Sequence, residues 1–351
     1  MDIRTNVPLA PHTALAVGGP AERLIVIEST AQLVEALSRA DLAPFWILGY
    51  GANVLISDAG LPGTTLLMRS SGIEIQGSTL IADAGVWWDD LVRAALDHGL
   101  WGLELTSAIP GNVGAAVVGN IAAYGQAVSD TLEWVEVYDP ATTALRRLET
   151  AELKLSYRFS AFQTDELRSW VITRAGFKLS ATASTDLTYR SALDVARELS
   201  YDVTTLAGRR ATILETRKRA GSIWDYRNPD AESHTAGSFF RNPMVDTATA
   251  EKIMSYDETG KSLELLKQMN LVHGGEQKRV SAAHVLLAAG FHRGQAWGPV
   301  RLHPDHILKI ENTGGATAQQ IYAVAQEIIH TVKEKLDIDL TPEVRYLGKF
   351  E

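Results

Sequence analysis

The sequence predicts an α+β protein with a two-lobed N-terminal unit and a C-terminal α/β domain. Three observations support this fold class. Strand and helix patterns alternate over residues 22–70, short strands and turns dominate residues 72–190, and a polar, turn-rich segment at 222–238 precedes the C-terminal helix and strand patterns. A chain of 351 residues is long enough for two or three domains with well-filled cores.

The composition is that of an ordinary globular protein and excludes several functional classes. Hydrophobic residues make up 46% and charged residues 21%, and the net charge of -9 argues against a nucleic-acid surface. The chain has no cysteine, which excludes a disulfide, a thiolate metal site and a cysteine nucleophile. The first residues lack the pattern of a secretory signal, and no apolar run approaches the roughly 20 residues of a membrane span. We therefore expect a cytoplasmic protein.

The first lobe is predicted to alternate strand, helix and strand up to about Ser70. Ser29 followed by Gln32 has the pattern of a capping box, which indicates the start of a helix. Leu33 and Leu37 would then lie on one face of that helix. The predicted elements are a strand at 22–29, a helix at 31–40, strands at 45–48 and 54–57 joined by a glycine-bearing turn, and a strand at 64–70.

The second lobe is predicted to contain two hairpins and one helix. The pair Gly77 and Ser78 lies between two short strand patterns, which is typical of a hairpin. Gly99 stands where a glycine would cap the C-terminus of a helix. The predicted elements are a hairpin at 73–85, a helix at 87–99, a hairpin at 131–149 and a strand at 169–179.

The C-terminal part is predicted to alternate helices and strands after a basic helix. Thr317 followed by Gln320 repeats the capping-box pattern and indicates a long helix. The predicted elements are a basic helix at 204–221, a helix at 281–290, a strand at 306–312, the long helix after Thr317 and a last strand at 343–347.

Two stretches of small residues are candidates for binding a flat or anionic ligand through the backbone. Residues 48–57 contain a glycine turn between strands, and glycines let backbone N–H groups approach phosphates closely. No G-x-G-x-x-G run opens a helix there, so the dinucleotide fingerprint is absent. Residues 107–126 carry four glycines and almost no large side chain. An ordinary turn and a small-residue packing seam are the respective alternatives.

Single polar residues offer further candidates. Arg158 lies beside Tyr157 in an otherwise apolar run, where an arginine would bind a carboxylate through two hydrogen bonds or form a structural ion pair. Glu343 follows a proline at the head of a strand, where a glutamate is usually solvated. His303 and His306 have no accompanying carboxylate pattern, which disfavours a metal site.

Seven segments of the chain together resemble the UDP-N-acetylenolpyruvoylglucosamine reductase (MurB) family. They lie between Thr13 and Gly348, cover nearly the whole chain and occur in the family's order. The segments are HTALAVGGPAE, ILGYGANVLISDAG, SAIPGNVGAA, NIAAYGQ, LSYRFSAFQ, TAGSFFRNP and PEVRYLG. A longer loop before LTYRSA, with Tyr189, fits the form of the family that has a substrate-contacting tyrosine.

The resemblance implies a flavoenzyme of peptidoglycan precursor synthesis. It would hold FAD non-covalently in a unit of the vanillyl-alcohol-oxidase (PCMH) type at about 15–190, with lobes at about 1–70 and 71–190. A substrate-binding domain would occupy 205–351. NADPH would donate the hydride, and UDP-N-acetylglucosamine enolpyruvate would be reduced to UDP-N-acetylmuramate. The implied FAD-binding residues are Gly49, Tyr50, Gly51, Ala52, Asn53, Val54, Ile109, Pro110, Gly111, Gly114, Asn120, Ile121, Tyr124 and Gly125.

The resemblance also implies roles for the polar residues. Ser238 would give a proton to the carbon next to the one that receives the hydride, because that carbon gains carbanion or enol character. Arg158 and Glu343 would polarise the substrate carboxylate, with Glu343 protonated or acting through a bridging donor. The implied substrate contacts are Tyr157, Tyr189 and Asn242.

The chain departs from the family pattern in its basic segment. The family usually has a lysine in an R-x-x-K-G-M run, where this sequence has Ala220 and, at the methionine, Ser222. Lys218 or Arg219 would be the replacements from neighbouring positions. Phe159 stands where an aspartate is common. These departures put the substrate affinity in doubt more than the type of reaction.

Two other functions remain open from the sequence alone. One is another FAD oxidoreductase on the same scaffold, which would have no reason to combine Ser238, Arg158 and Glu343. The other is a non-catalytic flavin-binding or UDP-sugar-binding relative, which the missing lysine favours. The expected partners are the small-molecule substrate and NADPH, without nucleic acid or membrane insertion.

Overall fold

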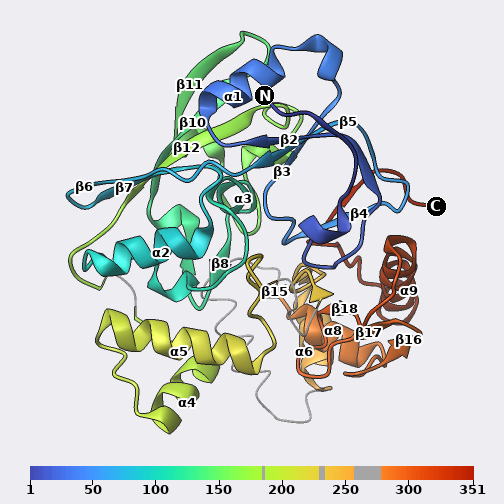
Figure 1. The fold of residues 1–351 in the computed structure, drawn as a ribbon. Coiled ribbons are helices and arrows are strands. Elements are labelled where there is room, and N and C mark those ends of the chain that lie inside the picture. Colours follow the sequence, from blue (N-terminus) through green and yellow to red (C-terminus); the bar gives the residue numbers. More distant parts are fainter. Residues whose placement is uncertain (184–185, 229–233, 257–277) are drawn as a thin grey trace. The chain divides into compact units, whose positions relative to one another are not determined.

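The computed structural model describes residues 1–183, 186–228, 234–256 and 278–351, and divides the chain into two compact units (Figure 1). Each unit is discontinuous in sequence. Unit 1 comprises Met1–Val7, Pro20–Gly51 and Leu61–Pro229, and unit 2 comprises Pro8–Gly19, Ala52–Gly60 and Asp230–Glu351. Two short N-terminal segments therefore belong to the same unit as the C-terminal part.

The first sheet of unit 1 confirms the predicted strand, helix and strand alternation. Its strands run in the order β1-β2-β5-β3, and β5 pairs in parallel with both β2 and β3. The elements are β1 (Arg4–Pro8), β2 (Pro20–Ile27), α1 (Thr30–Leu37), β3 (Phe45–Leu48) and β5 (Leu61–Met68). Ser29 caps α1 as predicted, since its hydroxyl accepts the N–H of Gln32 at 3.3 Å.

The predicted strand at 54–57 forms, but it does not join the first sheet. β4 (Val54–Ile56) pairs in parallel with β19 (Arg345–Leu347), and both lie in unit 2. Leu55 is fully buried in the same apolar core as Phe239 and Val344. Its assignment to the α/β lobe was therefore wrong, because burial of a side chain against distant residues decides where so short a strand pairs.

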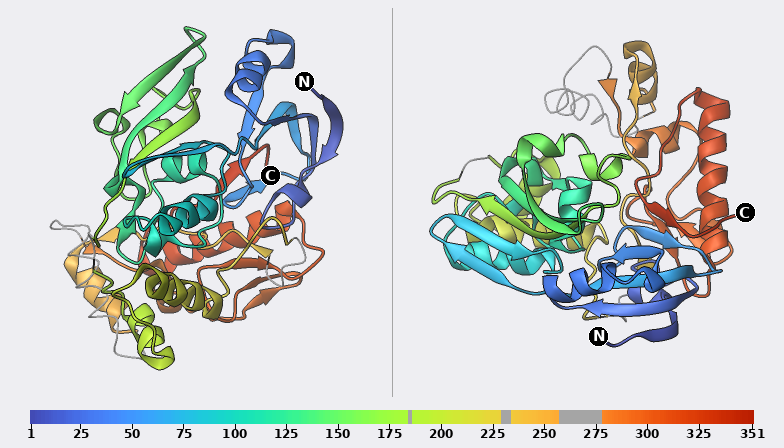
Figure 2. Two further views of the ribbon diagram at one scale, coloured as in Figure 1. Left: turned by 60° about the vertical axis from the view of Figure 1, so that its left-hand side comes forward. Right: turned by 90° about the horizontal axis from the view of Figure 1, so that it is seen from above.

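The second sheet of unit 1 confirms both predicted hairpins (Figure 2). Its five antiparallel strands run in the order β11-β10-β12-β7-β6. Helices α2 and α3 share its apolar core. The elements are β6 (Ile73–Gln76), β7 (Thr79–Asp83), α2 (Trp88–Asp97), α3 (Val113–Gly119), β10 (Leu132–Asp139), β11 (Ala144–Glu149) and β12 (Val171–Lys178).

Unit 1 also contains two helices from the end of its sequence, α4 (Arg190–Leu199) and α5 (Leu206–Arg219). The sequence analysis assigned residues from 205 onward to the C-terminal domain, whereas α5 packs on the 3-10 helix Glu104–Thr106 within unit 1. The proposed limits 15–190 and 205–351, as functional domains, stay predictions.

A buried ion pair holds α5 in this position. Arg209 Nη1 lies 3.0 Å from Glu104 Oε1, and the side chains are 6% and 1% exposed. The other Glu104 oxygen accepts the N–H of Gly102 at 2.8 Å and an amide N–H of Gln126 at 3.3 Å. Arg209 also lies over the ring of Trp101, 5.0 Å from its centroid. All oxygens of a nearly inaccessible carboxylate thus have donors, which compensates for its lost hydration.

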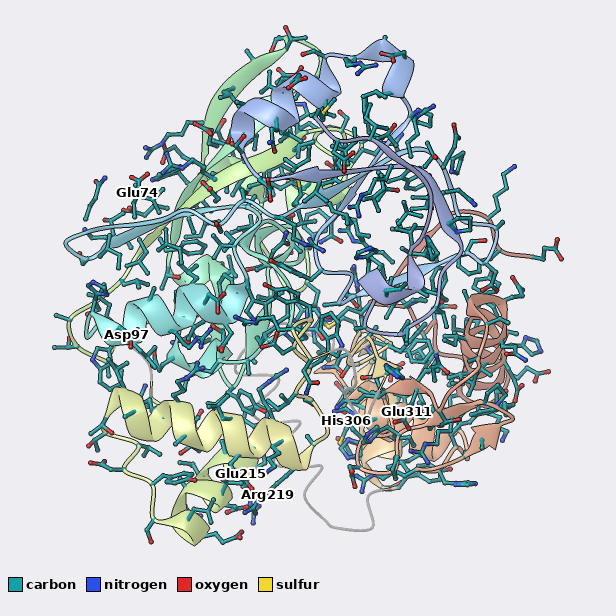
Figure 3. All side chains as sticks on the ribbon, in the orientation of Figure 1. Glu74, Asp97, Glu215, Arg219, His306 and Glu311 are labelled. Atoms are coloured by element: carbon teal, nitrogen blue, oxygen red, sulfur yellow. The ribbon has the colours of Figure 1, made fainter. Side chains whose placement is uncertain are left out.

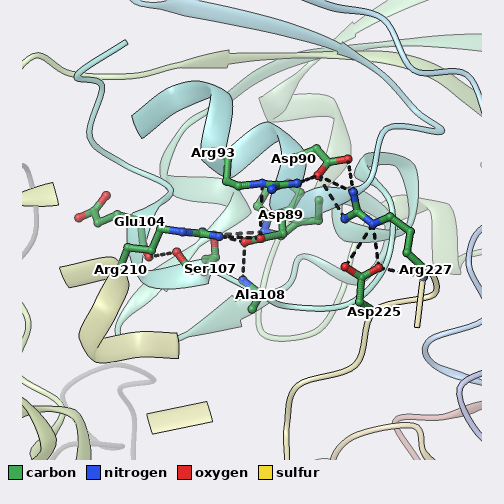
Figure 4. A network of polar contacts seen from close by, with 11 residues as sticks. Asp89, Asp90, Arg93, Glu104, Ser107, Ala108, Arg210, Asp225 and Arg227 are labelled. Atoms are coloured by element: carbon green, nitrogen blue, oxygen red, sulfur yellow. Dashed lines mark hydrogen bonds and ion pairs between the residues drawn. The ribbon is translucent and has the colours of Figure 1, made fainter. Parts of the chain in front are cut away.

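A second pair joins α5 to α2 (Figure 4). Arg210 binds Asp89 through two hydrogen bonds of 2.9 and 2.7 Å. Burial raises the pKa of Asp89, but Arg210 and the N–H of Ala108 outweigh it and hold the pKa below its ordinary value. The Ala108 bond is 2.7 Å long and fixes the start of the loop before α3.

The described part of unit 2 is built on a small antiparallel sheet and three helices. The sheet order is β13-β18-β17-β16, and one apolar core joins it to the helices and to Leu15, Val17 and Leu55 of the N-terminal segments. The elements are β13 (His234–Thr235), β14 (Met244–Val245), α6 (Thr247–Met254), β15 (Lys278–Arg279), α8 (Ala282–Ala288), β16 (Ala296–Trp297), β17 (Val300–Leu302), β18 (Ile310–Asn312) and α9 (Ala318–Leu336).

The N-terminus of α9 confirms the predicted capping box. Thr317 and Gln320 each accept the backbone N–H of the other, at 3.1 and 3.0 Å. Asp58 accepts two further N–H groups, those of Ala318 and Gln319, both at 2.9 Å. A segment far away in sequence thus completes the cap. Among the described helices, none combines the length and apolar character needed to cross a bilayer.

Arg209→Met is expected to lower the free energy of unfolding by about 3 to 5 kcal/mol, because Glu104 would stay buried without its cation. Urea unfolding measures this change. Arg219→Met is the control on the same helix, where Arg219 pairs with Glu198 and Glu215 at the surface (Figure 3). Its variant should unfold close to the parent. If both variants lose the same free energy of unfolding, burial does not decide how much an ion pair contributes here.

Candidate functional site

Two of the predicted FAD-binding loops meet within unit 1. A Cβ atom on Gly49 would lie 2.7 Å from Oδ1 of Asn112, so the backbone at Gly49 lies directly against the residue that caps α3. Gly51 has φ +65, a conformation that favours glycine. The two stretches, about 60 residues apart in sequence, therefore form one small-residue surface.

The first amide groups of α3 are already used within the protein. The N–H of Val113 binds the Val86 carbonyl and that of Gly114 binds the Ala84 carbonyl, both at 2.9 Å. The N–H of Ala115 binds the side chain of Asn112 at 3.0 Å. This helix end therefore lacks the donors that usually bind a phosphate.

The backbone amide groups of the loop at residues 50–52 are available to a ligand. Within the described part of the chain, the N–H groups of Tyr50, Gly51 and Ala52 have no hydrogen-bond acceptor. Consecutive backbone N–H groups beside glycines are a known arrangement for binding anions. A Cβ added at Gly111 or Gly125 would meet nothing within 4 Å, so these backbones have open space beside them. The small-residue surface thus fits a cofactor that carries a diphosphate.

Tyr50 is enclosed by residues that the sequence analysis did not select. Its ring lies 4.1 Å from the Tyr226 ring and 4.9 Å from the Trp87 ring, measured between centroids. The guanidinium carbon of Arg69 lies 4.0 Å from the centroid of the Tyr50 ring. Burial and a hydrogen bond with Tyr226 raise the pKa of Tyr50 well above its usual value, so its phenol stays neutral.

Asn120 and Ile121 have structural contacts in addition to their predicted role. The amide of Asn120 donates to the Ser156 carbonyl at 2.8 Å and accepts the N–H of Ser129 at 3.0 Å. Asn120 also ends α3 in a left-handed conformation, with φ 40. Its side chain therefore shapes the loop, and contact with the cofactor stays a prediction for both residues.

Three tyrosines of unit 1 are neighbours of one another, and one of them, Tyr124, interacts with Arg217. The rings of Tyr124 and Tyr189 lie 5.3 Å apart in an edge-on arrangement, and the hydroxyl of Tyr124 is hydrogen-bonded to Arg217. Tyr157 is close enough to Tyr189 to raise the pKa of Tyr189, after the larger effect of burial. Burial lowers the pKa of Arg217, and its Nε is shielded from solvent without a hydrogen-bond partner among the described residues. The predicted substrate contacts Tyr157 and Tyr189 are thus neighbours.

Arg217, rather than either proposed replacement, is the cation of this cluster. Arg219 lies in ion pairs with Glu198 and Glu215 on the outer side of α5, and Lys218 is exposed. Ala220 ends the helix, and Arg217 donates to the Ser222 carbonyl at 2.8 Å. Sequence reasoning missed Arg217 because it compared only the positions next to the absent lysine. Its place three residues before Ala220, on the same helix face, was the available signal.

Ser238 and Glu343 come together within unit 2. Phe240 forms a β-bridge with Pro342, and the N–H of Glu343 binds the Phe239 carbonyl at 2.8 Å. Ser238 is half-buried between Gly237, which has φ +74, and the fully buried Phe239. The aromatic pair Phe239 and Phe240 therefore fixes the serine backbone.

The predicted cofactor residues Asn53 and Val54 reach the same part of unit 2. The Asn53 side-chain amide donates to the Glu343 carbonyl at 3.2 Å, and Val54 pairs with Arg345. Burial and the neighbouring Arg241 lower the pKa of Arg345. The region around Glu343 therefore contains two guanidinium groups, those of Arg241 and Arg345.

Asn242 and Arg158 make contacts within their own units. The Asn242 side chain accepts the N–H of Ala282 at the start of α8, at 2.9 Å, and its carbonyl accepts from Arg279. Arg158 belongs to unit 1, where it has φ 52 in a tight turn and its carbonyl accepts an amide N–H of Gln163 at 3.0 Å. The roles of Asn242 in substrate binding and of Arg158 in catalysis stay predictions.

His303 and His306 stabilise a turn. Nδ1 of His303 accepts the N–H of Asp305, and Nδ1 of His306 accepts the N–H of Leu308. Burial lowers the pKa of His306 to about 4, so its ring is neutral near pH 7. No group of three metal-ligating side chains occurs in the described ranges.

The chain matches two family models that follow the order of its parts. Residues 21–148 match the FAD binding domain, and residues 228–347 match the C-terminal domain of UDP-N-acetylenolpyruvoylglucosamine reductase. These matches define a flavoprotein that combines an FAD-binding module with a reductase-specific domain.

Full-length relatives agree with this class. UDP-N-acetylenolpyruvoylglucosamine reductase of Thermobifida fusca is 34% identical, over 98% of this chain and 97% of the relative. The reductase of Streptomyces coelicolor is 33% identical, over 98% of this chain and 90% of the relative. The crystal structure of the Thermus caldophilus enzyme aligns with a TM-score of 0.63 at 24% identity, covering 99% of this chain and 100% of that one. The chain belongs to the UDP-N-acetylenolpyruvoylglucosamine reductase family, and the fold class is confirmed.

Gly49→Ala is expected to weaken FAD binding by about tenfold, because the added Cβ would displace either the loop or Asn112, at a cost of about 1 to 3 kcal/mol. Flavin fluorescence during titration of the deflavinated full-length protein measures this. Gly119→Ala is the control on α3, since its Cβ would meet only Ile121, at an ordinary 3.6 Å. FAD binding at parental strength in both variants would show that the tight packing at Gly49 is irrelevant to the cofactor.

Proposed function

We propose that this protein is an NADPH-dependent FAD enzyme that reduces UDP-N-acetylglucosamine enolpyruvate to UDP-N-acetylmuramate, a step of peptidoglycan precursor synthesis, in the cytoplasm. This is the reaction of a UDP-N-acetylmuramate dehydrogenase. The observation that carries the proposal is the backbone pairing of Phe239 and Phe240, which follow Ser238, with Pro342 and Glu343, whose carbonyl accepts from Asn53, in a member of the reductase family. A proton donor and the cofactor loop thus share one part of unit 2.

The small-residue surface of unit 1 supports non-covalent FAD binding. The N–H groups of Tyr50, Gly51 and Ala52 would hold its diphosphate, and the open backbones at Gly111 and Gly125 leave room for flat groups. The chemistry that bound FAD would supply is transfer of a hydride from NADPH to the vinyl CH2 carbon of the substrate. The protein's own contribution is to bind both ligands, exclude water and supply the proton.

Ser238 supplies that proton in the proposed reaction. Hydride addition at the CH2 carbon places negative charge on the neighbouring carbon and its carboxylate. A half-buried hydroxyl on a backbone fixed by Phe239 and Phe240 suits transfer to such a strongly basic carbon. Water then restores the proton to the serine oxygen.

Arg158 and Glu343 would stabilise the charge on the substrate carboxylate. A guanidinium binds a carboxylate through two hydrogen bonds, which strengthen as the carboxylate gains charge. Glu343 contributes only as a neutral acid or through a bridging donor, because an ionised carboxylate would repel the substrate. The Tyr124, Tyr157, Tyr189 and Arg217 cluster would bind the diphosphate of the uridine nucleotide.

A non-catalytic UDP-sugar-binding relative is the second candidate, and Ala220 in place of the family lysine favours it. Rapid mixing separates the two. If the protein is a reductase, NADPH should bleach the flavin absorbance and the enolpyruvyl UDP-sugar should restore it without oxygen. Bleaching without restoration would reject the reductase function.

Ser238→Ala should leave the reaction with NADPH intact and slow the reaction with the enolpyruvyl sugar by about 10² to 10⁴-fold, the usual contribution of a general acid. Stopped-flow absorbance measures the two half-reactions separately. Ser238→Cys retains a proton donor and should recover part of the rate. Ser255→Ala, which removes a hydroxyl bound to its own helix turn, serves as the control. A Ser238→Ala enzyme with parental rates in both half-reactions would remove this residue from the mechanism.

Arg217→Gln is expected to raise KM for the enolpyruvyl sugar by about tenfold, with a smaller change in kcat, because a charged hydrogen bond contributes about 1.5 to 3 kcal/mol. Steady-state kinetics separate the two constants. Lys218→Gln is the control from the adjacent position and should change neither constant. If Lys218→Gln has the larger effect, the cation of this cluster has been assigned incorrectly.

A further inference from the structure

Arg69 lies against the glycine loop of unit 1, which comprises residues Gly49–Gly51. It follows the last residue of β5, and its Nη1 donates to the carbonyl of Gly49 at 2.9 Å and to that of Met68 at 2.8 Å. Its guanidinium carbon lies 4.0 Å from the centroid of the Tyr50 ring. One side chain therefore contacts two consecutive residues of the loop, through hydrogen bonding and cation–π attraction.

The charge of Arg69 has no carboxylate partner among the described residues. Its Nε and Nη2 make no hydrogen bond to the described part of the chain, and its electrostatic neighbours are the phenols of Tyr50 and Tyr226. Two other arginines of unit 1, Arg23 and Arg210, differ in this respect. Arg23 lies 3.1 Å from Glu22, and Arg210 lies 2.7 Å from Asp89. A half-buried cation without a counter-ion creates a local potential that favours an anion.

The direction of the Arg69 hydrogen bonds adds to this effect. The guanidinium occupies the Gly49 carbonyl, while the N–H groups of Tyr50 and Gly51 have no acceptor in the described part of the chain. The loop therefore offers the N–H donors of Tyr50 and Gly51 to a ligand, while its Gly49 carbonyl already accepts a hydrogen bond from Arg69. The rings of Tyr50 and Tyr226 shield the guanidinium from water, and burial lowers its pKa, although an arginine stays charged.

We propose that Arg69 is the positioning cation of the FAD diphosphate: it fixes the Gly49–Gly51 backbone and supplies the positive charge that the two phosphates require. This inference rests on the proposed function, because it names the residue that makes the glycine loop selective for a dinucleotide flavin. The chemistry recognised is a diphosphate ester, and an uncharged flavin would gain nothing from it.

A purely structural role for Arg69 makes a different prediction. If the side chain only holds the loop against β5, its loss would weaken the binding of all flavins equally, because the isoalloxazine ring of each would contact the same disturbed surface. If the charge acts on the phosphates, FAD would lose more affinity than riboflavin. The comparison of FAD with riboflavin therefore separates the two roles.

The test uses the full-length protein, freed of flavin and titrated with FAD, FMN and riboflavin while flavin fluorescence is followed. Arg69→Met removes the charge and Arg69→Lys retains it. Arg23→Met is the matched control, since Arg23 lies in the adjacent strand β2, also donates to a carbonyl, that of Leu42, and has Glu22 as its counter-ion. Urea unfolding shows that each variant is folded.

We expect Arg69→Met to weaken the binding of FAD by about tenfold or more and the binding of riboflavin by less than about threefold. The affinity of Arg69→Lys for FAD should lie between those of the parent and Arg69→Met. Rising salt should weaken FAD binding in the parent more than in Arg69→Met. Equal losses for FAD and riboflavin, or the same discrimination in Arg23→Met, would overturn the inference. A parent protein that binds no FAD would instead reject the proposed function.

Discussion

The candidate site depends on the ion pairs that two consecutive arginines of α5, Arg209 and Arg210, form with carboxylates. Arg209 neutralises the buried Glu104, and Arg210 binds Asp89, which also accepts the N–H of Ala108. Because the Asp89 carboxylate binds both Arg210 of α5 and the N–H of Ala108, the position of α5 is coupled to the segment that leads to Gly111. A buried ion pair that loses one partner is strongly destabilising, so this coupling is rigid.

The division of the N-terminal sequence between two units explains how the catalytic candidates meet the cofactor loop. Chain continuity carries the loop from Gly51 in unit 1 to Ala52 in unit 2. There β4 pairs with β19, and Asn53 contacts the backbone of Glu343. Asn53, two residues after Gly51 in the chain, therefore contacts the residue proposed to polarise the substrate carboxylate within unit 2.

The charge distribution of unit 1 is consistent with anionic ligands even though the whole chain is acidic. Arg69 and Arg217 are both withdrawn from water, and both contact tyrosine phenols. Surface arginines such as Arg219 instead face glutamates. Net charge argues against a nucleic-acid surface as a class, but it carries no information on local cations, because the local potential depends on which charges lack a partner.

The sequence by itself determined the elements and the family. Local rules were sufficient for the cap at Ser29, the hairpin turn at Gly77 and the capping box at Thr317, since each depends on residues three or four positions apart. Only the tertiary structure decided the pairing of β4 with β19, the place of α5 in unit 1 and the burial of Arg69 and Arg217 beside tyrosine phenols. Those features depend on burial and on partners distant in sequence, more than 100 residues away for β4 and α5, and such contacts leave no periodic trace in the sequence.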